Sequence, residues 1–307
     1  MHHDRVLGLR LVKLATTAGY SAVSRALRPG SATRQNMAWL PISIVCATAV
    51  LETFALDGLL DEKIIGGTVT HVDDAKFMAQ VITYNYESDK NVEISSCGGS
   101  LISTTHVLTA GHCAGKPTET VVFAGSSDFM KTGKRGSAYG VKDIRVHPKY
   151  HAVYLKNGSS YANYDVAVIK LRSAVPLGAK TGVISITKVN APPKPGTPLT
   201  IAGWGIYKTN SDSSSKQLRR GVYTALSRTI CSNKLGSTFT EQEICTTSFP
   251  NSAFCSGDSG GPAYVGTLQY GIVSWGDCGQ KYFPSVLTNL ANPEINSFVR
   301  NMLKTMQ

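Results

Sequence analysis

Short apolar segments, separated by turn-forming residues, recur through most of this chain. Four of them span residues 100–108, 166–171, 199–204 and 270–275, and Gly, Pro, Asn, Asp and Ser are frequent between such segments. Short runs that alternate or stay apolar between turn formers are typical of β-strands. The pattern therefore predicts an all-β body.

The last segment has a different periodicity. Asn292 is a suitable N-cap, and Pro293 suits the first position of a helix. The apolar residues that follow recur at helical spacing: Ile295, Phe298, Val299, Met302 and Leu303. We expect a C-terminal α-helix that packs on the β body through this face.

The N-terminal part differs in composition from the body. Residues 1–36 form a basic extension that resembles an organellar transit peptide, unless translation begins at Met37, and we assign it no role. Residues 37–49 form a signal-like segment, with an apolar core too short to span a bilayer and a small-x-small pattern that ends at Ala49. Residues 50–63 are interpreted as a propeptide, because the sequence changes character after Lys63.

Composition narrows the class of protein. The chain has 307 residues, of which 42% are hydrophobic and 17% charged, which is typical of a globular protein and unlike a disordered one. The net charge of +11 would suit a nucleic-acid partner. However, the Lys and Arg residues are scattered, and no basic run is interleaved with aromatic residues. We therefore predict no nucleic-acid binding and one domain behind a leader.

The seven cysteines indicate disulfides. Cys46 leaves with the leader, and six remain for three bridges: Cys97, Cys113, Cys231, Cys245, Cys255 and Cys278. Zinc is disfavoured because no Cys-x-x-Cys pair occurs and no His lies at ligand spacing from another His or Cys. Disulfides indicate an oxidising compartment, so we expect a secreted, extracellular protein.

One glycine-rich segment carries a candidate nucleophile. Ser259 lies in Gly257-Asp258-Ser259-Gly260-Gly261-Pro262, four residues after Cys255. Glycines let the backbone turn sharply, so that two N–H groups can converge on one point. The same composition would also suit a plain surface turn.

A serine nucleophile needs a base and a group that orients the base. His112 ends an apolar strand beside Cys113, whereas His71, His106, His147 and His151 have the character of surface or loop positions. Asp165 lies at the start of a strand that is expected to be buried. Each residue alone has an ordinary structural explanation, but the three contexts together indicate a catalytic triad.

These segments resemble the chymotrypsin and trypsin family of serine peptidases. The resemblance covers residues 64–307 and depends on six motifs in family order: Ile64 to Gly67, Thr109 to Cys113, Asp165 to Val168, Gly203 to Gly205, Gly257 to Pro262 and Ser274 to Gly276. It implies two six-stranded antiparallel β-barrels with the site between them. It further implies disulfides Cys97–Cys113, Cys231–Cys245 and Cys255–Cys278.

The resemblance also assigns roles. Ser259 would attack the peptide carbonyl, His112 would transfer the proton, and Asp165 would orient His112. The backbone N–H groups of Gly257 and Ser259 would form the oxyanion hole. Cleavage after Lys63 would free the amine of Ile64 to pair with Asp258, and residues Ser274, Trp275 and Gly276 would pair with the substrate.

The expected specificity pocket departs from that of trypsins. The position six residues before the nucleophile, an aspartate in trypsins, is Ala253, and the bulky Phe254 follows it. Ser285 narrows the pocket, Gly276 leaves its entrance open, and only Asp277 near the entrance would favour a basic residue. We expect cleavage after uncharged residues of small to medium size, and therefore no self-activation after Lys63.

The remaining expectations concern partners and alternatives. We expect protein or peptide substrates, an activating protease, protein inhibitors, a monomer, no cofactor and no metal. The segment that matches the family's calcium loop has only Asp128 as an acid. A catalytically silent peptidase-like binding protein is the alternative function. A carboxylesterase is disfavoured because Ser259 is not in a Gly-x-Ser-x-Gly motif.

Overall fold

The computed structural model describes residues 67–88, 91–133, 136–155, 160–206, 214–247, 254–276 and 283–307. These residues belong to one compact unit that spans Ala55–Gln307. The extension, the signal-like segment and the propeptide, with Lys63 and Ile64, lie outside the described residues. No helix in the described ranges is long and apolar enough to cross a membrane.

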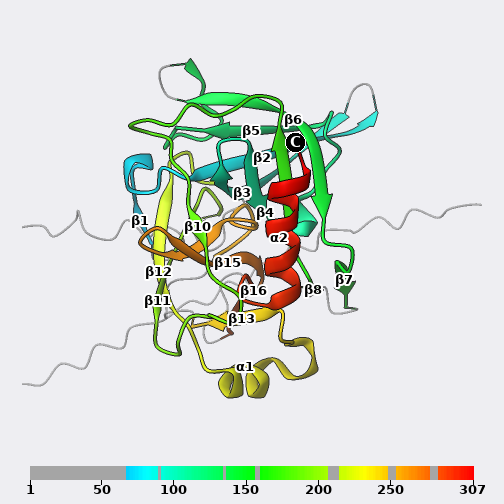
Figure 1. Ribbon diagram of the computed structural model, residues 1–307, viewed down its shortest axis with the longest axis vertical. Coiled ribbons are helices and arrows are strands. Elements are labelled where there is room, and N and C mark those ends of the chain that lie inside the picture. Colours follow the sequence, from blue (N-terminus) through cyan, green and yellow to red (C-terminus); the bar gives the residue numbers. More distant parts are fainter. Residues whose placement is uncertain are drawn as a thin grey trace, which may run out of the picture. The chain divides into compact units, whose positions relative to one another are not determined.

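The first half of the body is a closed antiparallel barrel with the strand order β2-β3-β4-β9-β6-β5 (Figure 1). Its strands are β2 (Met78–Ser88), β3 (Asn91–Ser103), β4 (His106–Thr109), β5 (Thr120–Ala124), β6 (Ser137–Val146) and β9 (Ala167–Leu171). Inward-facing aliphatic side chains such as Val81, Leu101 and Ile169 fill the barrel. Alternate strand residues point to opposite faces, so one side of each strand supplies this core.

The second half is a sheet with the order β1-β12-β11-β14-β15-β16-β13. Its strands are β1 (Thr68–Val69), β11 (Pro198–Gly203), β12 (Arg219–Thr224), β13 (Glu243–Thr246), β14 (Pro262–Val265), β15 (Leu268–Trp275) and β16 (Ser285–Asn289), and β10 (Ser185–Ile186) pairs with β15. An antiparallel bridge between Ala225 and Thr246 connects the ends of β12 and β13. The six strands from β12 to β13 therefore close on themselves, and the predicted double six-stranded barrel is confirmed.

The predicted strands are found with one correction. Segments 166–171, 199–204 and 270–275 correspond to β9, β11 and β15. Segment 100–108 is not one strand, because β3 ends at Ser103 and β4 begins at His106. Thr104 and Thr105 form the turn between them, although neither is a strong turn former.

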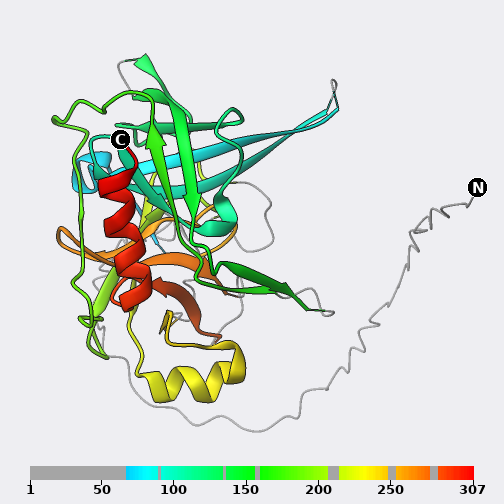
Figure 2. The ribbon, with the colours of Figure 1, turned by 45° about the vertical axis from the view of Figure 1, so that its right-hand side comes forward.

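Two smaller elements flank the barrels. A hairpin of β7 (His151–Tyr154) and β8 (Ser160–Asn163) leads to Asp165. Figure 2 shows it as a narrow green arm that extends away from both sheets. Helix α1 (Arg228–Leu235) precedes β13, and Ser227 caps it by accepting a hydrogen bond from the Ile230 N–H.

The C-terminal helix α2 (Pro293–Thr305) confirms the prediction from periodicity. The Asn292 side chain caps its first turn by accepting from the N–H groups of Glu294 and Ile295. Ile295 and Val299 are fully buried in a cluster that also contains Leu108 and Ile272, one residue from each barrel. Helix α2 therefore packs over the junction of the two halves, as the red helix in Figure 1 shows.

Candidate active site

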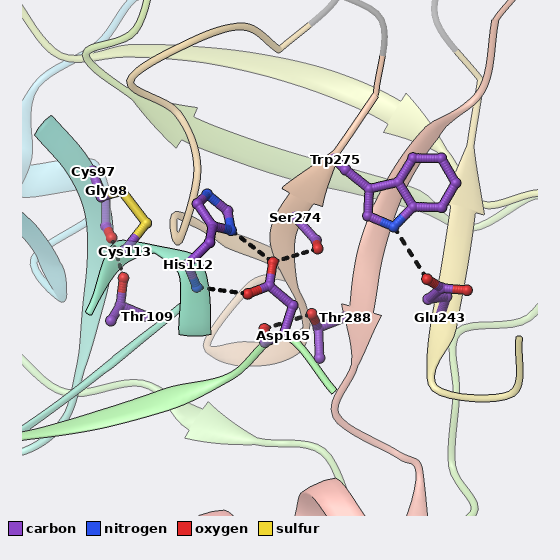
Figure 3. Close-up of polar contacts among 10 residues, drawn as sticks. All are labelled: Cys97, Gly98, Thr109, His112, Cys113, Asp165, Glu243, Ser274, Trp275 and Thr288. Carbon is purple, nitrogen blue, oxygen red and sulfur yellow. Dashed lines mark hydrogen bonds and ion pairs between the residues drawn. A yellow bond between two sulfur atoms is a disulfide. The ribbon is translucent and has the colours of Figure 1, made fainter. Parts of the chain in front are cut away.

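Asp165 lies between β8 and β9, only 1% exposed, and both of its carboxylate oxygens accept hydrogen bonds. Oδ1 accepts from the backbone N–H of His112 at 2.9 Å, and Oδ2 accepts from His112 Nδ1 at 2.8 Å. The Ser274 hydroxyl also donates to Oδ2, at 2.5 Å, and the Thr288 hydroxyl donates to the Asp165 carbonyl at 2.7 Å. Residues from both barrels thus fix this carboxylate (Figure 3).

The electrostatics of the pair favour its charged forms. Burial would raise the pKa of Asp165, but hydrogen bonds and charge from His112, with the hydroxyl of Ser274, outweigh it and lower that pKa. Burial would likewise lower the pKa of His112, whereas the hydrogen bond and charge of Asp165 raise it overall. The carboxylate therefore stays ionised at neutral pH and stabilises a protonated imidazole.

The loop that carries His112 is tied to the barrel. His112 lies in a 3₁₀ turn (Gly111–Cys113), and a disulfide joins Cys113 to Cys97 of β3. The Thr109 hydroxyl donates to the Gly98 carbonyl at 2.8 Å, which fixes the end of β4. The imidazole remains 31% exposed, so it is both restrained and accessible.

A cysteine and histidine cluster at this position is not a metal site. Ligand atoms of Cys97, His112 and Cys113 lie within 4.8 Å of one another, and no other such group occurs among the residues described. Both sulfur atoms are consumed by the disulfide. They are therefore unavailable as thiolate ligands.

The segment around Ser259 packs against β3 of the first barrel and β15 of the second barrel. The Gly98 N–H donates to the Ser259 carbonyl at 2.7 Å, and the Gly260 N–H donates to the Val273 carbonyl at 2.8 Å. Gly260 has φ +79°, and a Cβ atom there would lie 2.5 Å from the Gly98 carbonyl oxygen. Only glycine allows this backbone conformation and this close approach.

The structure places Ser259 and His112 on adjoining segments, but no hydrogen bond joins their side chains within the described part of the chain. Such contacts are often long without substrate and shorten in the complex. Gly257, the other expected oxyanion donor, has φ +95° in the same turn.

Asp258, directly before Ser259 in the chain, is fully buried. Its Oδ1 accepts from the Gly205 N–H at 2.9 Å and its Oδ2 from the Cys255 N–H at 3.1 Å. Burial raises its pKa to about 6, although these two hydrogen bonds act in the opposite direction. A Cβ atom on Gly205 would lie 2.5 to 2.7 Å from the carboxyl atoms, which explains the glycine there.

Three of the expected pocket residues come together. A Cβ atom on Gly276 would lie 3.4 Å from Ser285 Cα and 3.6 Å from a ring carbon of Phe254. Phe254 is buried and packs against Tyr223, with ring centroids 6.1 Å apart. Ala253, at the expected base of the pocket, lies outside the described residues, as does Asp277.

The disulfides agree with the expectation where the structure describes both partners. Cys97–Cys113 and Cys231–Cys245 are bridged. Cys255 is also disulfide-bonded. Its expected partner, Cys278, lies outside the described residues.

The burial of some polar residues differs from what the sequence predicts. His71 and His151 are exposed as predicted. His147 lies in a loop, as the prediction allowed, although it is only 5% exposed; the prediction is wrong for His106, which is 5% exposed and begins strand β4. Burial lowers the pKa of both. Thr288 and Glu243 are not predicted by any pattern in the sequence, because their partners Asp165 and Trp275 are distant along the chain.

Comparison with known proteins identifies the family. The Trypsin family model matches residues 64–298. A trypsin of Simulium vittatum is 31% identical over 262 residues, which cover 80% of this chain and 99% of that protein. Hypodermin-B of Hypoderma lineatum is 29% identical (82% and 93% covered), and trypsin 5G1 of Aedes aegypti is 32% identical (75% and 82% covered). The chain therefore belongs to the trypsin family of serine endopeptidases.

Proposed function

We propose that this protein is a secreted serine endopeptidase, made as a precursor, that cleaves peptide bonds with the triad His112, Asp165 and Ser259. The observation that carries the proposal is the Asp165–His112 pair, held by donors from both barrels beside the Ser259 segment. Two disulfides support a secreted location, because such bonds persist in oxidising compartments.

The chemistry follows from the positions of these groups. Ser259 Oγ attacks the carbonyl carbon while His112 Nε2 takes its proton, and the carbonyl electron pair moves onto oxygen. The N–H groups of Gly257 and Ser259 stabilise this oxyanion, and one such donor contributes about 10²- to 10³-fold in rate. His112 then gives the proton to the leaving amine, and water, deprotonated by His112, releases the acyl group from Ser259.

Activation would require cleavage after Lys63 by another protease. The new amine of Ile64 would pair with the buried Asp258, whose described partners are two backbone N–H groups. Pairing raises the pKa of the amine above its free value of about 8. The active form should therefore persist at lower pH and be lost as the pH rises through the raised pKa. Full activity well above pH 10 with the fold intact would contradict this step.

We further propose a preference for uncharged residues of small to medium size at the cleaved position. Phe254 and Ser285 lie together near Gly276, and neither carries a charge that could pair with Lys or Arg. The named relatives include trypsins, so the proposed preference must be tested against a preference for Arg or Lys. Positional scanning with peptide libraries tests it directly. Strong preference for Arg or Lys would overturn the assignment and point to Asp277 as the acid that selects them.

Covalent labelling tests the catalytic proposal. A fluorophosphonate probe should label the protein after cleavage at Lys63, and Ser259→Ala should abolish labelling without loss of the fold. Absence of labelling in the cleaved, folded protein would favour the alternative, a catalytically silent binding protein. Protein or peptide substrates, protein inhibitors and a monomeric state complete the proposal, and we propose neither a nucleic-acid partner nor a metal or other cofactor.

A further inference from the structure

Glu243 is a buried acid whose side chain reaches Trp275 of β15. It lies in β13, is 5% exposed, and uses both carboxylate oxygens as acceptors. Oε1 accepts from the indole Nε1 of Trp275 at 3.1 Å, as Figure 3 shows. Oε2 accepts from the backbone N–H of Thr240 at 2.6 Å and lies 3.0 Å from the Thr240 hydroxyl.

The contacts of Glu243 extend to the β7–β8 hairpin that leads to Asp165. The Thr240 hydroxyl also lies 3.4 Å from Asn163 Oδ1, and Asn163 is two residues before Asp165. The ring of Tyr161, in the same strand β8, lies 6.2 Å from the Trp275 ring, centroid to centroid. The Trp275 indole therefore lies between an aromatic residue of the β7–β8 hairpin and a carboxylate of the second barrel.

Burying the carboxyl group of Glu243 costs free energy, which a purely structural role would not require. Burial raises the pKa of the Glu243 carboxyl, although the bonds from Thr240 and Trp275 and the charge of Arg228 oppose the shift. Within the described residues no Lys or Arg forms an ion pair with Glu243. A packed apolar side chain often stabilises such a site at least as well as a buried charge. Packing alone therefore does not explain why an acid occupies this position.

We propose that Glu243 is a positioning residue, which fixes the Trp275 indole so that β15 presents a preformed edge to the peptide residues that precede the cleaved bond. The inference depends on the proposed function, in which Ser274, Trp275 and Gly276 pair with substrate. Trp275 follows Ser274 directly, and Ser274 donates to Asp165, so the same strand supports both the triad and the substrate. Glu243 itself acts only through Trp275.

Glu243→Gln keeps the size of the side chain but removes one of its two acceptor oxygens. The amide has one acceptor oxygen, so it can satisfy either the indole N–H or the Thr240 N–H, and its NH₂ group must then face the other donor. Glu241→Gln is the matched control, because that side chain is 82% exposed and, among the described residues, forms only a 3.9 Å ion pair with Arg228. Trp275→Phe removes the indole donor and keeps an aromatic ring.

The full chain would be produced, cleaved after Lys63 and assayed with two substrates. One is a tetrapeptide amide, and the other is an ester of the single residue that precedes the cleaved bond in that tetrapeptide. For Glu243→Gln we expect KM for the tetrapeptide to rise about tenfold, the effect of losing one charge-assisted hydrogen bond. We expect kcat and the ester kinetics to change less than about twofold, since Glu243 touches no reacting atom. Added to Trp275→Phe, the Gln substitution should have no further effect.

Two kinetic results would overturn the inference. One is an unchanged KM for the tetrapeptide, and the other is an equal loss on both substrates with slower fluorophosphonate labelling, which would indicate general structural support. The indole N–H resonance of Trp275, assigned through Trp275→Phe, gives a readout that needs no activity. It should shift in Glu243→Gln and not in Glu241→Gln. If the wild-type protein neither labels nor cleaves, the proposed function fails. An unshifted Trp275 resonance in Glu243→Gln would by itself overturn the positioning role.

Discussion

At the scale of single residues, the state of His112 depends on Asp165. The carboxylate accepts from Nδ1, which leaves Nε2 of the neutral ring available for the role that we propose for it, accepting the Ser259 proton. Since Asp165 raises the pKa of His112, the ring stays protonated over a wider acidic range than an isolated histidine, and a protonated ring could not act as the proposed base.

The first prediction is that the His112–Asp165 pair determines how activity depends on pH. The acidic limb of kcat/KM should have its midpoint above 6.5, the ordinary pKa of histidine. Asp165→Asn should lower kcat by about 10⁴-fold, as in the family's triad, and move the midpoint down because the charge that raises the pKa is gone. The pH dependence of peptide hydrolysis measures both. An acidic limb that stays in place in the variant would contradict the prediction.

The second prediction uses two glycines with positive φ. Gly260 (φ +79°) lies against Thr109 and the Gly98 carbonyl, whereas at Gly266 (φ +58°) an added Cβ atom would meet no other atom within 4 Å. Gly260→Ala should therefore abolish fluorophosphonate labelling and lower stability by more than about 2 kcal/mol, but Gly266→Ala should cost about 1 kcal/mol through backbone strain. Urea unfolding and labelling measure the difference, and similar effects of both variants would argue against the packing of Gly260.

The sequence predicts residues whose local context is distinctive. His112 is recognisable because Cys113 follows it, and Ser259 because glycines surround it. Glu243 lies in the ordinary strand sequence Glu-Ile-Cys-Thr, and its partner Trp275 is 32 residues away. Its burial therefore depends on tertiary packing, which no local pattern contains.

At the scale of elements, strand periodicity and the helix signals of residues 292–303 predict most of what forms. The turn at Thr104 and Thr105 escapes prediction because no Gly, Pro, Asn or Asp marks it. The bridge between Ala225 and Thr246, which closes the second barrel, also has no local sequence signal. A bridge between distant strands depends on the twist of the whole sheet.

The third prediction compares the two described disulfides. Their sequence separations are 16 and 14 residues, so chain entropy predicts a similar loss of about 3 kcal/mol on removing either by Cys→Ser pairs. Only Cys97–Cys113 adjoins His112, so only its loss should also reduce kcat in molecules that remain folded. Denaturant unfolding and kinetics, measured side by side, separate the two effects. Equal kcat losses would show that the first bridge has no specific role at the site.

At the scale of the whole molecule, the buried Asp258 couples stability to pH. Its pKa of about 6 in the folded chain exceeds the ordinary 3.8. Protonation therefore favours folding. This contribution is fully present below about pH 3.8 and is lost as the pH rises through about 6.

The fourth prediction tests this coupling in the uncleaved chain. Between pH 4 and pH 7 the free energy of unfolding should fall, through Asp258, by on the order of 3 kcal/mol relative to Asp258→Asn, which cannot ionise. Urea titrations of both proteins across this range give the difference. Parallel pH profiles would show that Asp258 is already paired with a cation before cleavage.

The contact between His106 and the end of helix α2 has a consequence for synthesis. His106 Nε2 lies 3.0 Å from the carbonyl oxygen of Met306, 200 residues further along the chain. At about 5 to 20 residues per second, a ribosome needs roughly 10 to 40 s to make the intervening segment. Until α2 is made, the residues of the first barrel that it later covers, such as Leu108, lack this cover, so a chaperone could bind them during synthesis.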